Sequence, residues 1–211
     1  MATANRFAKL EQAAVAIIGG LAVKRYLRTL RETEDVDFLV AFDEDVEIGK
    51  SGPMGQLPLG IANIFKGKLC ERSRDDFEVI GQAFYVKIDT INGRESVQID
   101  FTTFQTSPYI PNAATPIREI DLEAELPYIS LQDLVIFKIF SCGLRASDAK
   151  RYRDDHDAEH LIRELDSQGQ IVLSDRQKEV VEGMDVLDDV VKALGQRLPK
   201  YWWEVKLNLY W

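Results

Sequence analysis

The chain has 211 residues, with an apolar fraction of 45% and a charged fraction of 29%. It is therefore long enough and apolar enough to form a stable core without disulfide bonds or structural metal ions. Its only cysteines, Cys70 and Cys142, lie far apart and in no metal-binding spacing, which predicts a cytoplasmic protein rather than a secreted disulfide-rich one. A formal net charge of −9 disfavours non-specific nucleic-acid binding, and the apolar run over residues 13–23 is too short to span a bilayer, so no membrane partner is expected.

The N-terminal part predicts alternating helices and strands. In chain order we expect a helix over 7–14, a buried strand over 14–20, a helix over 21–30 and a strand over 36–42. The first strand ends at the glycine pair Gly19 and Gly20, and the helix after it carries Arg25, Arg28 and Arg31. These arginines either steer phosphate or simply form a solvated helix face.

The middle of the chain predicts a loop, a helix and a hairpin. Residues 43–60 are rich in glycine, proline and acidic residues, which is typical of a mobile loop, and residues 61–73 have the pattern of a helix. Two alternating runs over residues 84–104 flank Asn92-Gly93, which is the strongest short-range signal for a β-hairpin.

Composition changes from strand-rich to helix-rich at the proline-punctuated connector over residues 108–116. We therefore place a boundary near residue 112, with a core over 1–112 and a C-terminal helical region with an aromatic tail over 113–211. Helices are expected over 131–144, 148–165 and 175–198. Ser130 is expected to cap the first of them, with Asp133 in the capping-box position, and Ser174 precedes the third.

The aromatic tail over residues 199–211 contains Trp202, Trp203, Tyr210 and Trp211. We expect it to pack back on the body or into the partner of a homodimer, because clustered aromatic residues usually serve burial. Stacking on a nucleobase is the alternative role of these rings.

The segment Glu34 to Val40 sets Asp35 and Asp37 one residue apart in a strand, so both side chains point to the same face. Two carboxylates this close repel each other unless a cation lies between them, and oxygen-rich sites suit Mg²⁺ or Mn²⁺. Asp100 in the second hairpin strand supplies a third acid if that strand pairs beside the first. Two ions held in this way stabilise the attacking and leaving oxygens of a phosphoryl or nucleotidyl displacement.

Gly19 and Gly20 fit the same chemistry, because glycines let backbone N–H groups approach a phosphate at the positive end of the following helix. Taken singly, neither signal is specific. A glycine pair is more often a tight turn, and an isolated pair of aspartates is more often a solvated strand end.

Together, the segments IIGGLAV, RETEDVDFLV and VQIDF resemble the nucleotidyltransferase superfamily of DNA polymerase beta. The pattern formed by Arg31, Thr33, Asp35 and Asp37 is most similar to the branch that contains AbiEii-type toxins and small antibiotic nucleotidyltransferases. The helical segment from Ser130 onward resembles the same branch. The resemblance implies an α+β fold with a mixed sheet flanked by helices, followed by a C-terminal helical region.

The resemblance also implies roles for particular residues. Asp35, Asp37 and Asp100 would bind metal, and Asp100 is also a candidate base for the acceptor hydroxyl. The donor NTP, with ATP among the candidates, would be bound by Gly19, Gly20, Arg31, Thr33 and Lys138. Asp154 is the favoured catalytic acid of the later helix, where Asp155 and Asp157 compete for the same position.

Lys138 and the segment His156 to His160 can each be interpreted in two ways. Lys138 interrupts an apolar run, where burial without an anionic partner is costly, although its side chain can also reach the surface by snorkelling. The segment His156 to His160 matches the inverted zinc-protease motif, with Glu159 as its base. We favour two surface histidines over zinc proteolysis, because the motif needs a third ligand and commonly matches by chance.

The sequence thus predicts a metal-dependent nucleotidyltransferase that moves an NMP from an NTP to an acceptor hydroxyl and releases pyrophosphate. Mg²⁺ or Mn²⁺ is the expected cofactor, and the acceptor is a small molecule, a protein or RNA. The alternative is a repurposed member of the fold that acts as a binding or regulatory protein, or on another small molecule.

Overall fold

The computed structural model describes residues 13–41, 57–121, 123, 125–193, 195 and 197–210. The chain divides into two compact units, the first made of Met1–Ala22 with Arg31–Ile129 and the second of Val23–Leu30 with Ser130–Trp211. Among the described residues, no helix combines the length and the apolar character that crossing a membrane requires.

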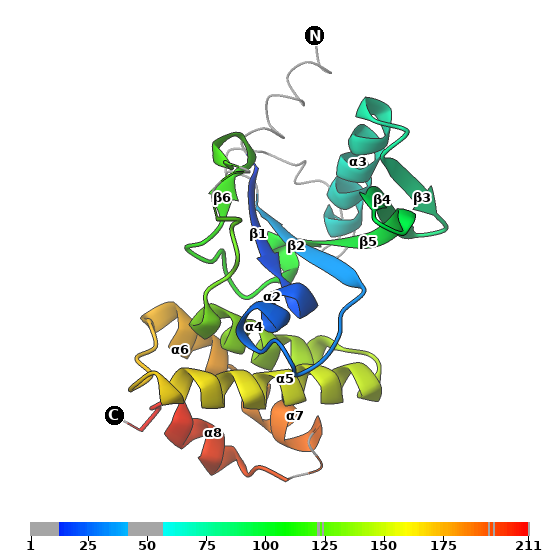
Figure 1. The fold of residues 1–211 in the computed structure, drawn as a ribbon. Coiled ribbons are helices and arrows are strands. Elements are labelled where there is room, and N and C mark those ends of the chain that lie inside the picture. The colour runs from blue at the N-terminus through cyan, green and yellow to red at the C-terminus, as the bar shows by residue number, and fades with distance from the viewer. Residues whose placement is uncertain are drawn as a thin grey trace. The chain divides into compact units, whose positions relative to one another are not determined.

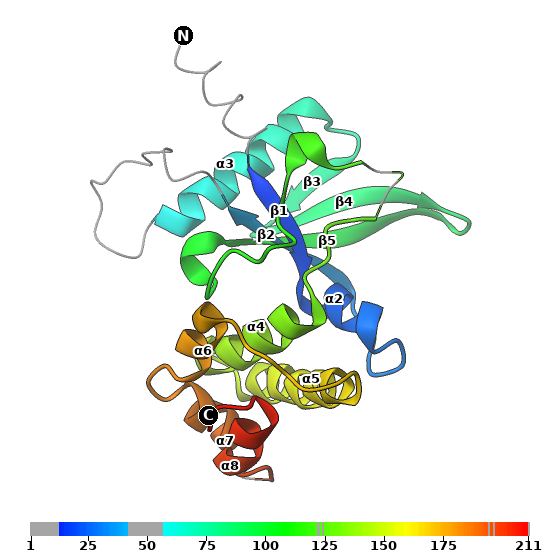
Figure 2. The same ribbon diagram turned by 90° about the vertical axis from the view of Figure 1, so that its left-hand side faces the viewer.

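The first unit is built on a six-stranded mixed sheet, shown in Figures 1 and 2. Its strands are β1 (Ala14–Ile18), β2 (Asp35–Ala41), β3 (Phe77–Ile80), β4 (Ala83–Thr90), β5 (Gly93–Thr103) and β6 (Thr115–Pro116). They lie in the order β3-β4-β5-β2-β1-β6. Strands β2 and β5 are parallel, whereas their other neighbours are antiparallel. The α+β class and the mixed sheet expected from the sequence are confirmed.

One face of this sheet is apolar and aromatic. Val15 and Val40 are buried beside partly buried Phe38 and Phe101. The rings of Phe38 and Phe101 lie 6.1 Å apart, and the ring of Phe84 lies 5.8 Å from that of Phe101. Since successive side chains of a strand point to opposite faces, the residues between these apolar positions point away from this layer. That alternation leaves the other face of β2 and β5 available for polar side chains.

Helices α2 and α3 begin and end at different residues than expected. Helix α2 (Gly19–Tyr26) ends before residue 30, and residues 28–30 form a turn. Helix α3 (Leu57–Arg72) begins before residue 61, because Pro58 lies in its first turn, where a missing N–H costs nothing. The rest of the expected loop, residues 43–56, and residues 7–12 of the expected N-terminal helix lie outside the described residues.

The predicted hairpin is present as β4 and β5, with one difference at its turn. Thr90 pairs with Gly93, so Ile91 and Asn92 form the connection, and the left-handed conformation falls on Gly93, at a φ of 116°. Glycine adopts this conformation without the steric penalty of a Cβ. Strand β3, which adds a third strand to the hairpin, is not expected from the sequence.

The connector between the sheet and the later helices is part of the first unit. It contains the short 3₁₀ segments Phe104–Thr106 and Ile117–Glu119 around strand β6. Ile17 donates a backbone hydrogen bond to the carbonyl of Pro127 (2.8 Å) and accepts one from Ile129 (3.0 Å). The expected boundary at residue 112 therefore falls inside this compact unit. The division into a nucleotidyltransferase core over 1–112 and a helical region over 113–211 stays a prediction.

The second unit is helical. It contains α4 (Leu131–Leu144), α5 (Asp148–Ser167), α6 (Asp175–Val181), α7 (Val186–Ala193) and α8 (Lys200–Lys206). Helices α4 and α5 run side by side, α7 packs against both, and α6 packs against α4 (Figure 1). The helix expected over 175–198 is instead interrupted, because the chain turns at Gly183 and then takes a left-handed φ of 65° at Asp185.

Two helix N-termini of the second unit are joined by a buried hydrogen bond. Ser130 caps α4 by accepting from the N–H of Asp133, as expected, and Ser174 forms a complete capping box with Gln177 at the start of α6. The Gln177 side chain then donates to the Asp133 carboxylate at 2.7 Å. Both side chains are buried, so this hydrogen bond satisfies polar atoms that have little access to water.

The aromatic tail packs within the second unit. Trp203 and Leu207 are fully buried, and Arg163 lies 5.1 Å over the ring of Trp202. The expectation that the tail returns to the body is therefore confirmed for Trp203. Trp211 lies outside the described residues, and the homodimer stays a prediction.

We predict that Gln177→Met destabilises the protein by about 2 kcal/mol, because it removes one half of a capping box and one of the hydrogen bonds to the buried Asp133 carboxylate. Denaturant unfolding would measure this loss. The matched control is Gln168→Met at the exposed end of α5, which should change stability by less than about 0.5 kcal/mol. Equal stability of the two variants would contradict the role of Gln177.

Candidate metal and nucleotide site

Three carboxylates converge on the polar face of the sheet. In the parallel pairing of β2 and β5, Asp37 lies directly opposite Asp100, and Asp35 lies two residues earlier on the same face. An oxygen of each side chain lies within 4.8 Å of an oxygen of the other two, and all three are half-buried. The pairing expected from the sequence is therefore present, and the three acids form the one group in the described part of the chain suited to a metal ion.

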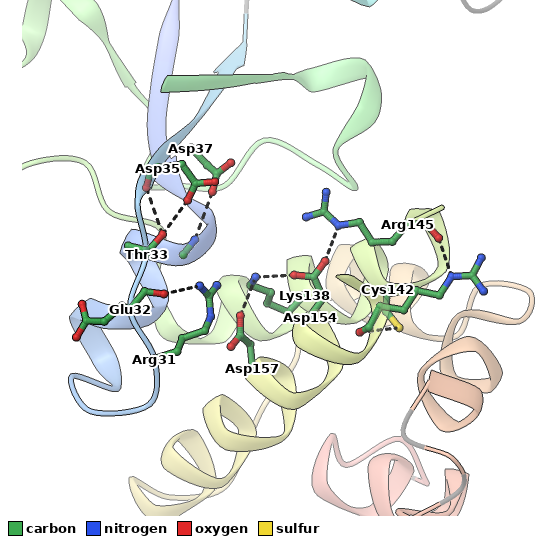
Figure 3. A network of polar contacts seen from close by, with 12 residues as sticks. Arg31, Glu32, Thr33, Asp35, Asp37, Lys138, Cys142, Arg145, Asp154 and Asp157 are labelled. Atoms are coloured by element: carbon green, nitrogen blue, oxygen red, sulfur yellow. Dashed lines mark hydrogen bonds and ion pairs between the residues drawn. The ribbon is translucent and has the colours of Figure 1, made fainter. Parts of the chain in front are cut away.

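Uncharged hydrogen-bond donors hold each of these carboxylates. The Thr33 hydroxyl donates to Asp35 at 2.8 Å, and the backbone N–H of Gly20 donates to Asp37 at 3.3 Å (Figure 3). The side-chain amide of Gln98 donates to both oxygens of Asp100, at 3.2 Å each. These three contacts therefore bring no positive charge to the carboxylates.

The glycine pair is required by space as well as by backbone conformation. Gly19 has a φ of 66°, and a Cβ at this position would lie 1.7 Å from a carboxylate oxygen of Asp37. A Cβ at Gly20 would lie 2.3 Å from the Thr33 hydroxyl and 3.2 Å from the Arg31 guanidinium. The absence of a side chain at Gly19 and Gly20 allows the first turn of α2 to lie against the acidic cluster.

A second charged cluster lies within the helical unit. Lys138 of α4 is buried, with its Nζ 2.6 Å from the carboxylate of Asp154 and 3.0 Å from that of Asp157, both on α5. Arg145 also donates to Asp154 at 2.6 Å (Figure 3). Lys138 thus reaches anionic partners instead of snorkelling to the surface, as a buried ammonium requires.

The charge state of Asp154 follows from this cluster. Burial alone would raise the pKa of its carboxyl group, but the charges and hydrogen bonds of Lys138 and then of Arg145 outweigh it and hold the pKa below the ordinary value. Asp154 is therefore ionised at neutral pH, and its negative charge is shared between two cations.

Comparison with known proteins decides the family. Residues 6–182 match the family model described as the nucleotidyl transferase AbiEii toxin of type IV toxin–antitoxin systems. The chain belongs to this AbiEii family. The sequence resemblance is thereby confirmed, and membership makes the protein a transferase of nucleotidyl groups.

One solved structure supports the fold of this AbiEii family member. It is described as an antigenic nucleotidyltransferase-like protein from Paracoccidioides brasiliensis, and it superposes with a TM-score of 0.57 at 16% sequence identity. The alignment covers 98% of this chain and 89% of that chain. No curated protein sequence matches the chain.

Two residues of these clusters were not expected from the sequence. Gln98 contacts Asp100, and Arg145 contacts Asp154. The alternation of β5 could have identified Gln98, since a residue two positions from Asp100 lies on the same face. The arginine follows the end of α4, and nothing in the local pattern marks its partner.

The structure leaves no support for the zinc-protease motif. The rings of His156 and His160 lie 4.5 Å apart, but Glu159 is buried and forms ion pairs with Arg163 and Arg197. A carboxylate held by two guanidinium groups is poorly placed to act as a general base. In the ranges that the structure describes, no third metal ligand accompanies the histidines.

Asp155 lies on the same helix as Asp154 and Glu159. In the described structure, neither oxygen of its own carboxyl group has a hydrogen-bond partner. Its side chain is fully buried, and burial, with the nearby charge of Glu159, raises the pKa of its carboxyl group to about 8. Asp155 is therefore protonated at neutral pH, unlike Asp154. Of the three competing acids of this helix, Asp154 and Asp157 are the two that form ion pairs with Lys138 in the described structure.

We predict that Gly19→Ala displaces Asp37 and disrupts the acidic cluster. The left-handed conformation alone costs alanine about 1–2 kcal/mol, and the clash with the carboxylate adds to that cost. The melting temperature and the Mn²⁺ affinity should both fall. Gly67→Ala in α3 is the matched control, because a Cβ there meets no atom within 4 Å and should stabilise the helix by about 0.5–1 kcal/mol. Unchanged Mn²⁺ binding in Gly19→Ala would contradict this account of the turn.

We predict that Asp155 lowers stability as the pH rises from about 4 to about 8. Its raised pKa means that the folded state binds a proton that the unfolded state has released, so the free energy of unfolding falls by about 1.4 kcal/mol per pH unit in this interval. Asp155→Asn should remove this slope, whereas Asp148→Asn, at a fully exposed position of the same helix, should keep it. Urea unfolding between pH 4 and pH 8 measures the slopes, and parallel curves for all three proteins would contradict the prediction.

Proposed function

We propose that this transferase uses a divalent cation to move an NMP from an NTP to an acceptor hydroxyl, with release of pyrophosphate. The observation that carries the proposal is the convergence of Asp35, Asp37 and Asp100 on one sheet face in a family of nucleotidyl transferases. Such a convergence has a cost, since three neighbouring carboxylates repel one another. A bound cation offsets that cost.

The donor set fits Mg²⁺ or Mn²⁺. All three ligands are carboxylate oxygens, they lie on two paired strands, and they are half-buried, so that a cation can enter. When bound, such ions neutralise charge on the attacking and leaving oxygens of an in-line displacement.

The remaining residues of the first unit bind and orient the substrates in this proposal. Gly19 and Gly20 let the phosphates of the NTP approach the N-terminal turn of α2, where the positive end of the helix dipole favours anions. Arg31, with its guanidinium beside Gly20, and Thr33, which fixes Asp35, complete the donor site. Asp100 holds the proton that the acceptor hydroxyl loses.

We include Lys138 and Asp154 as further catalytic residues, as the family resemblance implies. Their support is the buried ion pair at 2.6 Å, with Asp154 ionised and Arg145 as its second partner. In this role Asp154 fixes the position of the Lys138 ammonium group. Because the pair is buried, removing either charge would leave the other with one charged partner in place of two in the described structure.

The family description suggests a biological role. The family is described by a toxin of a type IV toxin–antitoxin system, which suggests that this protein acts as the toxin of such a system. We propose a cytoplasmic protein with a small-molecule, protein or RNA acceptor. The net charge of −9 favours the first two over RNA. A homodimer through the aromatic tail is part of the same proposal.

We predict that one NTP, together with Mg²⁺ or Mn²⁺, raises the melting temperature of the wild type. Ligand at one hundred times its dissociation constant stabilises the native state by about 2.7 kcal/mol, which corresponds to roughly 5–10 °C for a protein of this size. Asp35→Ala should abolish the rise. Asp89→Ala is the matched control, because this carboxylate on β4 is 90% exposed and belongs to no cluster of metal ligands in the described structure.

The alternative, a repurposed member of the fold, predicts different results. A metal-dependent rise in melting temperature without pyrophosphate release would favour a binding or regulatory protein. The absence of a rise with any NTP, in the presence of either metal, would contradict the proposed donor site.

A further inference from the structure

Gln98 lies on the same face of the sheet as the three acids. It lies on β5 two residues before Asp100, so both side chains point to the same side. In the sheet register it is directly opposite Asp35 on β2 and Tyr85 on β4. Its position alone therefore places it beside two of the three carboxylates.

The amide of Gln98 is directed at Asp100. Its Nε2 donates to both carboxylate oxygens, at 3.2 Å each, and the described structure shows no other hydrogen bond from this amide. An ionised carboxylate only accepts hydrogen bonds, so the nitrogen and not the oxygen of the amide must face it. This contact therefore fixes the orientation of the Asp100 carboxylate.

The chemical type of the donor matters as much as its position. Thr33 holds Asp35 by a hydroxyl, Gly20 holds Asp37 by a backbone N–H, and Gln98 holds Asp100 by an amide. All three donors are uncharged. A lysine or arginine at position 98 would also orient Asp100, but its charge would offset one of the negative charges that attract a cation.

We propose that Gln98 is a positioning residue of the metal centre, which orients Asp100 toward the cation without reducing the charge of the site. This inference rests on the proposed function, because it assumes that the three acids bind a metal. Groups that hydrogen-bond to metal ligands commonly change the metal affinity 10-fold to 100-fold when they are removed. The family resemblance itself assigns no role to Gln98.

We predict that Gln98→Met weakens Mn²⁺ binding about 10-fold, because methionine has a similar length but no donor. Electron paramagnetic resonance of free Mn²⁺, without nucleotide, measures this affinity independently of turnover. Gln98→Lys keeps a donor and adds a charge, so it should bind Mn²⁺ more weakly than Gln98→Met. If Gln98→Lys bound Mn²⁺ with wild-type affinity, the requirement for an uncharged donor would be disproved.

Ser96→Ala is the matched control. Ser96 lies on the same face of β5 but donates to Glu78 at 3.0 Å, away from the three acids, so its variant should bind Mn²⁺ as the wild type does. Melting temperatures without metal identify any loss of folding. Suppose that the wild type binds Mn²⁺, that Asp35→Ala abolishes this binding, and that Gln98→Met binds within twofold of the wild type. This result would overturn the role of Gln98 but not the metal centre. Absence of Asp35-dependent binding in the wild type would overturn the metal centre and this inference together.

Discussion

Electrostatic repulsion among Asp35, Asp37 and Asp100 is the constraint on which the site depends. The parallel pairing of β2 with β5 sets Asp37 opposite Asp100, and the period of a strand adds Asp35 to the same face. The apolar layer on the opposite face fixes this register, because a slip of one residue would bury the carboxylates and expose the phenylalanines. The fold therefore holds together groups that would separate in an unstructured chain.

The contacts around these acids show how that repulsion is tolerated. Their donors are a hydroxyl, a backbone N–H and an amide, which orient the oxygens but leave the charge. In the second unit, buried carboxylates are paired with cations instead. Asp154 and Asp157 are buried and form ion pairs with Lys138. Asp155 nearby has a raised pKa and is protonated, and therefore uncharged, at neutral pH. Carboxylates of one chain thus take different states because their surroundings differ.

Strong local patterns made much of the fold and of the acidic cluster predictable from the sequence. Alternation placed Asp35 and Asp37 on one face, and Asn92-Gly93 indicated the hairpin that carries Asp100. Tertiary contacts decided what local patterns did not. Strand β3 exists because it pairs with β4, and the break between α6 and α7 is formed by a turn at Gly183 and the left-handed residue Asp185. Likewise, Asp154 pairs with Lys138 through a contact between residues 16 positions apart in sequence, which no local pattern indicates.

Family membership and the acidic cluster support nucleotidyl transfer as the reaction. In this reaction the bond that breaks joins the α-phosphorus of the NTP to the oxygen that bridges it to the β-phosphorus. The most direct measurement compares NTPs labelled at the α- and at the γ-phosphate, incubated with the protein, Mg²⁺ and a cell extract as the source of acceptors. The account predicts that the α-label enters an acceptor and the γ-label appears in pyrophosphate, and that both signals are lost in Asp37→Asn. Transfer of the γ-label to an acceptor, or α-label transfer that persists in Asp37→Asn, would contradict it.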